Sequence, residues 1–501
     1  MSSLTRREFL RSAGGVTFLA LVPIGRGLFA APGETLPNFT ALPYVQPGNS
    51  SRLIDGHEAV VIAWQTELTP AEFQLDFGPT KAYGKTAQIS RAERWQGSTD
   101  ADKRYNYAAD LTGLHLSKEY HYRLRGNNKI IAEGYFTTRK KRGEQTRFVA
   151  FGDNSYGDPG QRAVAYHAYQ AHPDIIVNTG DNVYEHGLDS EYAKYFYPIY
   201  NADTPDPKVG APLLRSVPFY TVMANHDVSS KDAHRHPSAN FDQHRDSLAY
   251  YTAMHLPLNG PATPPSPTPV LGDPSLIADF QKSAGTRFPR MANYSFDHGD
   301  AHFLCLDSND YIDPTSPALH AYIEADLKAT DALWKFVVYH HPAFNVGAEH
   351  YTEQHMRAIS PFLEAHNVDF CLNGHEHVYQ RSMPMRFQPT DLSKATPSHV
   401  SARLIPGVFT LDKAFDGKTH TKPNGVIYIT TGAGGKELYD PGFDDHPELW
   451  LHPEDNNVAY VSRFVSNLHS FTVFDIHGST LVMTQIGEDG KELDRIEVTK
   501  A

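Results

Sequence analysis

Five short apolar runs after residue 145 are each followed at once by side chains that bind metal ions well. Each run has the length and the β-branched or aromatic content of a buried strand. Ligands of open α/β sheets gather beyond the carboxyl ends of the strands. We therefore expect these polar side chains to meet at one edge of a sheet. The runs are residues 148–151, 175–178, 219–223, 336–339 and 370–372, and the residues after them include Asp153, Asp181, Tyr184, Asn225, His226, His340, His375 and His377.

Each of these polar residues has an ordinary explanation when it is taken alone. An Asp after a strand is most often the N-cap of a helix, and a single His more often forms a structural hydrogen bond than binds a metal. Five strand ends of this kind in one segment are more than those explanations predict. We therefore interpret the set as the ligands of a metal site.

The segment around these runs has the pattern of an α/β layer structure. A helical stretch at residues 161–171 separates the first two runs, which predicts a β-α-β unit. Two more helical patterns, at 318–328 and 352–365, separate later strands. The end of the chain, 470–498, alternates around two turn signals and predicts hairpins. Further strands are expected at 294–296, 302–306 and 426–430.

The part of the chain before this segment predicts a separate all-β domain over residues 38–140. Its apolar residues recur with a period of two between turn signals, as in a β-sandwich. Tyr120, shortly after Leu111 to Leu114, resembles the tyrosine corner of fibronectin type III domains, and Asn127-Asn128 predicts a tight hairpin turn. We therefore expect an N-terminal β-sandwich followed by an α/β (α+β) domain over 145–500.

A stretch within the second domain, residues 229–290, breaks the pattern of strands and helices. It is rich in Pro and His and has no clear period. Irregular chain of this length is usually a functional lid or a disordered segment. We expect an irregular surface insertion that partly overhangs the metal site.

The first 31 residues predict an export signal. Thr5 to Leu10 forms a twin-arginine pattern, a mild apolar stretch follows at 16–22, and Ala30-Ala31 resembles a cleavage site. The apolar stretch is too short to span a bilayer. We therefore expect recognition by the twin-arginine export machinery, a periplasmic or secreted location and no stable insertion in the membrane.

Composition restricts the possible partners. With 45 basic and 58 acidic residues the formal net charge is -13, so no broad positive field attracts nucleic acid.

Cys305 and Cys371 are the two cysteines of the chain, which excludes a disulfide framework. We read them as buried free thiols, with a single disulfide between them as the alternative.

Three of the motifs resemble the metallophosphoesterase (calcineurin-like) superfamily and, within it, the purple acid phosphatases, which join a fibronectin-like domain to a catalytic domain. Gly180 to Tyr184 matches Gly-Asp-x-x-Tyr, Val337 to His340 matches Val-x-x-His, and Gly374 to His377 matches Gly-His-x-His. Tyr184 is the discriminating residue, because most relatives in the superfamily lack it. The resemblance covers nearly all of the chain after the signal and implies a four-layer αββα catalytic domain.

The resemblance also implies a role for each ligand. A ferric ion would be held in the first site, and iron(II), zinc or manganese in the second, with Asp181 as the bridge between them. This agrees with ligand chemistry, since ferric iron prefers carboxylate and phenolate oxygens and the imidazole-rich site suits the divalent ions. The ligands would be Asp153, Asp181, Tyr184 and His377 for the ferric ion, and Asp181, Asn225, His340 and His375 for the divalent ion.

This metal pair would let an acidic protein bind a phosphate ester. The metals supply about +5 and their anionic ligands about -3, which leaves roughly +2, or about +1 after a bridging hydroxide. The resemblance implies attack by a metal-bound hydroxide on a phosphate monoester. His350 would protonate the leaving alcohol, and His226 would bind the phosphate.

Two departures from the family pattern leave the subfamily open. Ala224 stands where the family has Gly before Asn-His, and Asp153-Asn154-Ser155 replaces Asp-x-Gly. Both changes affect the space available to the backbone rather than the ligands. Three functions therefore remain: a phosphatase that acts on small monoesters, a phosphodiesterase of the same fold, and a metal- or phosphate-binding protein without turnover. The oligomeric state is left open.

Overall fold

The computed structural model describes residues 36–49, 57–69, 71–228, 237–399, 402–444, 446–456 and 458–500. These residues belong to one compact unit, Leu36–Ala501. The expected signal at 1–31 lies outside the described residues. No helix in the described part of the chain has the length and apolar character needed to cross a bilayer.

The first eight strands form two four-stranded antiparallel sheets, as the period-two pattern predicts. Trp64 and Tyr107 stack between them with ring centroids 5.2 Å apart, within an apolar core of their own. One sheet has the order β1 (Phe39–Gln46), β2 (His57–Glu67), β6 (Lys103–His115) and β5 (Gln88–Trp95). The other has the order β4 (Lys85–Thr86), β3 (Phe73–Gly78), β7 (Glu119–Gly126) and β8 (Lys129–Thr137).

Two local features of this domain were visible in the sequence. The Tyr120 hydroxyl accepts a hydrogen bond from the backbone N–H of His115 at 3.0 Å, which is the bond of a tyrosine corner. The hairpin between β7 and β8 turns at Asn127 and Asn128, whose φ angles of 48° and 65° lie in the left-handed region that a type I′ turn requires.

The second domain contains two larger sheets. The six-stranded sheet has a parallel part, β9 to β11, and an antiparallel part made by the C-terminal hairpins. Its order is β11 (Phe219–Thr221), β10 (Ile175–Asn178), β9 (Thr146–Phe151), β23 (Ser470–His477), β24 (Thr480–Gly487) and β25 (Glu492–Thr499). The seven-stranded sheet has the order β14 (Tyr294–His298), β15 (Ala301–Cys305), β16 (Trp334–Val338), β17 (Phe370–Asn373), β21 (Ile427–Thr431), β18 (Tyr379–Ser382) and β22 (Val461–Val465).

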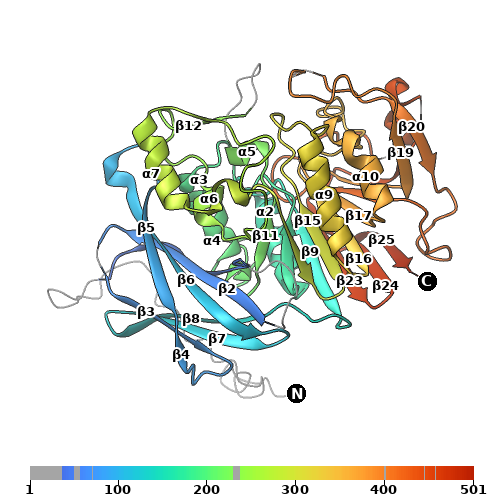
Figure 1. The fold of residues 1–501 in the computed structure, drawn as a ribbon. Helices are drawn as coiled ribbons and strands as arrows, with labels where there is room; N and C mark the ends of the chain where they lie inside the picture. The colour runs from blue at the N-terminus through green and yellow to red at the C-terminus, as the bar shows by residue number, and fades with distance from the viewer. Residues whose placement is uncertain are drawn as a thin grey trace, which may run out of the picture. The chain divides into compact units, whose positions relative to one another are not determined.

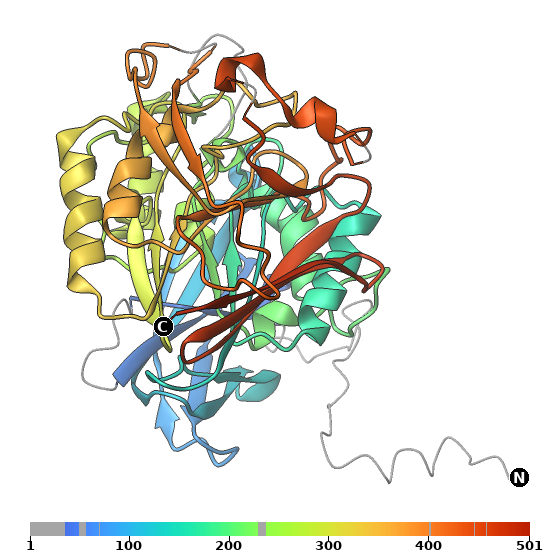
Figure 2. The same cartoon turned by 90° about the vertical axis from the view of Figure 1, so that its right-hand side faces the viewer.

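The two sheets pack face to face through aromatic side chains. Phe148 of β9 meets Phe303 of β15 and Phe336 of β16, each with ring centroids 5.1 Å apart. Helices cover the outer faces: α9 (Pro317–Ala329) and α10 (Ser360–Ala365) lie on one side, and α2 (Pro159–Gln170) lies on the other (Figures 1 and 2). This is the expected four-layer arrangement. The helix expected at 352–365 is only partly correct, because the chain forms a 3-10 turn at His355–Ile359 before α10 begins.

The insertion at 229–290 differs from the expectation in its secondary structure. It is not wholly irregular, since α7 (Pro274–Ala284) begins at Asp273, whose carboxylate accepts from the Ser275 N–H. Part of it packs on the N-terminal sandwich, and His244 stacks on His186 of the loop after Tyr184 with ring centroids 4.9 Å apart. Arg94 of β5 reaches into the insertion, donating to the carbonyl oxygens of Arg245 and Ser247. Residues 229–236 lie outside the described part of the chain.

The remaining elements are short and connect the layers. They are α3 (Asp189–Glu191), a π-helical turn (Tyr192–Phe196), α4 (Tyr197–Tyr200), a 3-10 turn (Leu213–Arg215), α5 (Asn225–Val228), β12 (Ala239–Asn240), α6 (Tyr250–Ala253), β13 (Val270–Leu271), α8 (Arg287–Arg290), β19 (Met385–Pro389), β20 (Gly407–Leu411) and 3-10 turns at Asp100–Asp102, Pro447–Trp450 and Pro453–Asp455. Cys305 in β15 and Cys371 in β17 are buried free thiols, as expected.

A buried His between two carboxylates makes the stability of this domain depend on pH. His302 of β15 is 2.7 Å from Asp297 and 2.8 Å from Asp326. Burial alone would lower its pKa, but the hydrogen bonds to these carboxylates raise the pKa of His302 above the ordinary 6.5. A raised pKa in the folded state stabilises the fold below pH 6.5, and this contribution is lost as the pH rises through the folded-state pKa.

We therefore expect His302→Gln to lower the free energy of unfolding most at acidic pH, and by less as the pH rises. Urea unfolding of both proteins, from about pH 6 upward, measures the difference. A difference that did not change with pH would contradict the assignment of a charged His302.

Candidate metal centre

The oxygen-bearing candidates all follow strands of the six-stranded sheet. Asp153 follows β9, Asp181 and Tyr184 follow β10, and Asn225 follows β11. These strands run parallel, so their carboxyl ends lie at one edge. Asp153 and Asp181 adopt φ angles of 55° and 49°, a left-handed conformation that Asp tolerates better than most residues. The sharp turn directs both carboxylates into the protein, where they are buried.

The imidazole candidates all follow strands of the other sheet. His340 follows β16, and His375 and His377 follow β17. These two strands are also parallel neighbours. The seven candidates therefore come from two sheets, with every oxygen donor on one sheet and every nitrogen donor on the other.

Four candidates form the first cluster. The Tyr184 hydroxyl is 3.2 Å from Asp153 Oδ1 and 3.2 Å from His377 Nε2. His377 Nε2 is 3.6 Å from the same Asp153 oxygen. Asp181 lies next to this group, because His340 Nε2 is close to both aspartates: it is 3.9 Å from Asp153 Oδ1 and 3.3 Å from Asp181 Oδ2. These are the residues expected to hold the first metal.

The second cluster adjoins the first through Asp181. Its Oδ2 is 3.3 Å from His340 Nε2. Asp181, His340 and His375 each offer one ligand atom, and these three atoms lie within 4.8 Å of one another. Asn225 begins α5 next to His226, whose backbone N–H donates to Asp181 Oδ1 at 3.0 Å. The structure thus brings the residues expected for both metals together around one shared carboxylate.

Hydrogen bonds behind the rings fix which nitrogen faces the cluster. The Nδ1–H of His340 donates to the Thr179 carbonyl at 2.8 Å, and that of His377 donates to the Glu437 carbonyl at 2.7 Å. In both rings Nε2 is left facing the carboxylates. His375 is reversed: its Nε2 bonds Glu353 Oε2 at 2.7 Å, which leaves Nδ1 for the cluster.

The donor atoms fit a metal pair. Among the described residues, Asn225 Oδ1 is a buried atom with no hydrogen-bond partner, and the buried His340 Nε2 faces only the carboxylates of the cluster. A buried polar atom without a partner is costly unless something binds it. Carboxylate, phenolate, amide and imidazole groups are the ligands that first-row transition metals accept in proteins.

Four glycines allow the loops to approach the ligands this closely. A Cβ on Gly374 would lie 2.5 Å from Asp153 Oδ2, and one on Gly432 would lie 2.8 Å from the same oxygen. A Cβ on Gly180 would lie 2.9 Å from His340 Nδ1, and one on Gly152 would lie 2.2 Å from Thr179 Oγ1. Gly432 begins the turn Gly432-Ala433-Gly434-Gly435, which therefore packs against Asp153.

Burial and mutual charge shift the protonation of the clustered groups. Burial raises the pKa of Asp153 well above its usual value, although His340 opposes the shift. Burial would also raise the pKa of Asp181, but the charges of His340 and His226 lower it overall. Burial would lower the pKa of His340, but Asp181 and Asp153 raise it to about 9. The Asp181–His340 pair is therefore charged without a metal, and a bound cation would replace the imidazole proton.

Both expected non-ligand histidines lie beside the cluster. The ring of His226 is 4.5 Å from that of Tyr184, and its Nδ1–H donates to the Glu185 carbonyl at 2.8 Å. The ring of His350 is 3.8 Å from that of His375. His350 lies in the loop after β16 and is partly exposed, so it can meet a substrate.

The sequence analysis missed Glu353, which connects two of these histidines. Its carboxylate accepts from His375 through Oε2 at 2.7 Å and bonds His350 Nδ1 through Oε1 at 3.1 Å. Burial would lower the pKa of His350, but Glu353 raises it to about 9. The three-residue spacing from His350 was visible in the sequence, but the contact with His375 was not.

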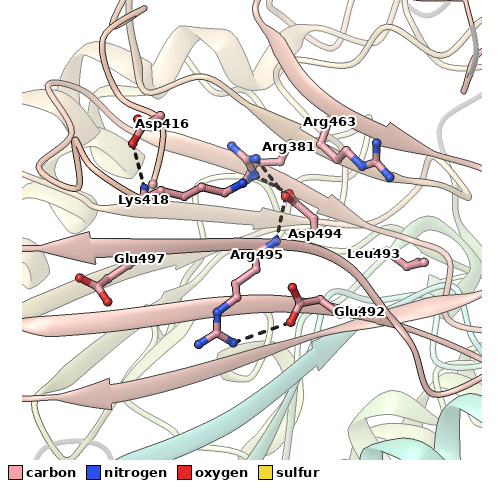
Figure 3. Close-up of a pocket in the computed structure, with 10 residues that line it drawn as sticks. Arg381, Asp416, Lys418, Arg463, Glu492, Leu493, Asp494, Arg495 and Glu497 are labelled. Carbon is pink, nitrogen blue, oxygen red and sulfur yellow. Dashed lines mark hydrogen bonds and ion pairs between the residues drawn. The ribbon is translucent and has the colours of Figure 1, made fainter.

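A groove of about 640 Å³ lies on β18, β22 and β25 and includes none of the expected ligands. Arg381 and Arg495 both bond Asp494 (Figure 3). The groove is lined by four cations and four carboxylates, so its formal charge is zero: Arg381, Lys418, Arg463, Arg495, Asp416, Glu492, Asp494 and Glu497. Because this groove contains none of the expected ligands and has no net charge, the candidate site remains the ligand cluster at the edge shared by the two sheets.

Comparison with known proteins agrees with this fold. Residues 146–379 match the model of the calcineurin-like phosphoesterases. Purple acid phosphatase 17 of Arabidopsis thaliana is 27% identical over 243 residues, covering 46% of this chain and 62% of the relative. Purple acid phosphatase 7 of the same plant is 25% identical over 330 residues, covering 64% of this chain and 78% of the relative.

Solved structures share the fold at low identity. The purple acid phosphatase PPD1 from yellow lupin (Lupinus luteus) seeds has a TM-score of 0.64 at 16% identity, covering 91% of this chain and 74% of its own. The structure of PhoD has a TM-score of 0.55 at 14% identity, covering 93% of this chain and 94% of its own.

The two-sheet fold and the match of the family model agree on a calcineurin-like metallophosphoesterase domain. Residues 146–379 belong to the calcineurin-like phosphoesterase family. Both plant relatives named above are purple acid phosphatases, and the chain is similar to them over 46% and 64% of its length. The resemblance found in the motifs is thereby confirmed.

Proposed function

We propose that this protein is a binuclear metal-dependent phosphatase that hydrolyses small phosphate monoesters, of the acid phosphatase type. The observation that carries the proposal is the pair of adjoining ligand clusters around Asp181, which lies 3.3 Å from His340 and within reach of His375. When bound, the two cations supply a positive charge that attracts the phosphate and a water activated for attack on phosphorus.

The donor sets favour a different metal in each site. Asp153, Asp181, Tyr184 and His377 give the first site three oxygen donors, which suits a ferric ion. Asp181, Asn225, His340 and His375 give the second site two nitrogen donors and fewer anions, which suits iron(II), zinc or manganese. Tyr184 would give a ferric protein a purple or pink colour.

The other residues beside the cluster suit the binding and protonation of a phosphate ester. His226 stands over Tyr184, held by its bond to the Glu185 carbonyl, with Nε2 left for a phosphate oxygen. His350 is held by Glu353, so its other nitrogen can deliver a proton to the leaving alcohol. A protein that only binds metal or phosphate has no need of such an acid, so these two residues favour turnover.

Elemental analysis and a visible spectrum of the purified protein test the proposal. We expect two metal ions per chain, with one ferric ion and an absorption band from the Tyr184 phenolate. A colourless, iron-free protein that also lacks a divalent metal would refute the proposal.

A steady-state comparison of monoester and diester model substrates separates the two enzymatic alternatives. We expect the higher kcat/KM with the monoester, because His350 and the metal pair suit a dianionic group with one leaving alcohol. A strong preference for the diester would favour a phosphodiesterase instead.

We also propose that the protein is exported folded through the twin-arginine pathway, to the periplasm or the medium. The motif at Thr5 to Leu10 motivates this. An enzyme that must acquire its metals before it crosses the membrane suits a pathway for folded proteins. Cell fractionation of the full chain and of an Arg6→Lys/Arg7→Lys variant tests it, and equal export of both would contradict it.

A further inference from the structure

A second pocket, of about 500 Å³, lies beside the start of the metal-ligand loops and has an unusual charge for this protein. Three cationic side chains line it, Arg162, Lys194 and Lys208, and the lining includes no carboxylate. The formal charge of the lining is therefore +3, in a chain whose net charge is -13. A local excess of this kind attracts anions to the pocket.

These cations are not neutralised by close ion pairs. Within the described part of the chain, none of the three forms a salt bridge at 4.0 Å or less with a carboxylate. Arg162 lies on α2, Lys194 lies in the π-helical turn, and Lys208 lies in the loop after α4. Three separate elements thus each contribute one cationic side chain to the lining of this pocket. The groove in Figure 3 differs, because its four cations face four carboxylates.

The pocket shares a wall with the metal centre. That wall is Tyr156, three positions after Asp153 in the same loop. The Tyr156 ring meets that of Tyr184 edge-on with centroids 6.4 Å apart and stacks on the ring of Tyr195 at 5.9 Å. Lys436 fixes this wall, with Nζ 3.4 Å from the Tyr156 ring centroid. A group in the pocket would therefore lie one aromatic ring away from a metal-ligand side chain.

We propose that this pocket binds a second phosphate group of the substrate, so that the enzyme selects organic phosphates carrying more than one phosphate. The inference rests on the proposed function. A guanidinium and two ammonium groups provide the fork and the point charges that bind phosphate oxygens. Tyr156 and Tyr195 also line the pocket, with Lys194 Nζ 4.6 Å from the Tyr195 ring centroid, so the organic part of the molecule would contact the edges of these rings.

The test compares a matched pair of substrates, fructose 6-phosphate and fructose 1,6-bisphosphate. The pocket variant is Arg162→Gln/Lys194→Gln/Lys208→Gln, and the control is Lys418→Gln/Arg463→Gln/Arg495→Gln in the groove of Figure 3. Both remove three positive charges. We expect the ratio of kcat/KM for the bisphosphate to that for the monophosphate to fall at least about tenfold in the pocket variant, as for one lost charged contact. In the control the ratio stays close to that of the wild type.

A binding measurement keeps this inference separate from the proposed function. Calorimetric titration of inorganic phosphate into the full-length protein counts anion sites without turnover, and we expect the pocket variant to lose one site that the control retains. The inference is overturned if both variants keep the wild-type ratio and number of sites. A lost site with an unchanged ratio also overturns it, because the pocket would then bind a free anion that takes no part in turnover. Absence of all turnover with the pocket site intact would refute the proposed function alone.

Discussion

Replacing Asp181 by Asn is expected to remove the metals and the activity together. Asp181 lies between the two clusters, with one oxygen 3.3 Å from His340 and the other bound by the His226 N–H. Asn keeps the shape but loses the charge and one oxygen donor, so neither metal would keep its full set. Even the loss of a partner behind a ligand costs about 10 to 100-fold in metal affinity, and we expect at least about 100-fold here.

Metal content by mass spectrometry and turnover of a monoester measure this result. A matched control is Asp76→Asn, which removes another buried carboxylate with close partners, in β3 of the N-terminal sandwich. Circular dichroism should show both variants folded. An Asp181→Asn protein with wild-type metal content and activity would rule out the shared-ligand assignment.

Replacing His350 by Ala is expected to reduce turnover while the metals stay bound. His350 is not among the expected ligands; its ring lies 3.8 Å from that of His375, and its Nδ1 bonds the carboxylate of Glu353. If it protonates the leaving alcohol, its loss should cost about 10² to 10⁴-fold in kcat. The loss should be large for an alkyl phosphate and much smaller for a nitrophenyl phosphate, whose leaving group needs no proton.

The dependence on leaving group separates catalysis from a structural effect. His420→Ala, at an exposed position, serves as the control and should leave both substrates unaffected. Equal losses for the alkyl and nitrophenyl substrates would show that His350 does not act as the acid. Loss of metal from the His350→Ala protein would show instead that the residue supports His375.

The sequence predicted the strands that position the site because those strands are continuously apolar and end in turn residues. The strand expected at 175–178 is β10 itself, and the polar residues after each run lie at the shared edge. The rule that parallel strands present their carboxyl ends together predicts that Asp153 and Asp181 meet on one sheet and that His340 and His375 meet on the other. The packing of the two sheets, which brings Asp153 to His377, had no such signal in the sequence. The charged edge strand β5 was not expected, because its exposed residues break the alternation.

Two failures have different physical origins. The helix α7 had a recognisable start, since Asp273 precedes Pro274 and an apolar stripe follows, but the Pro-rich surroundings hid it. Glu353 had no comparable signal. Its carboxylate connects His350, in the loop after β16, with His375, in the turn after β17. No periodic pattern in the sequence relates these two segments, so their contact is set by tertiary packing alone.

The division of donors between the sheets has a consequence for the order of metal loading. Each expected site combines oxygen atoms from the six-stranded sheet with nitrogen atoms from the seven-stranded one. The first cation to bind would therefore fix the spacing of the sheets at this edge, and the second would enter a site that is already in position. If the proposed pair of metals is bound, we therefore expect its uptake to be cooperative, and we expect a substitution that shifts one sheet against the other to weaken both sites at once.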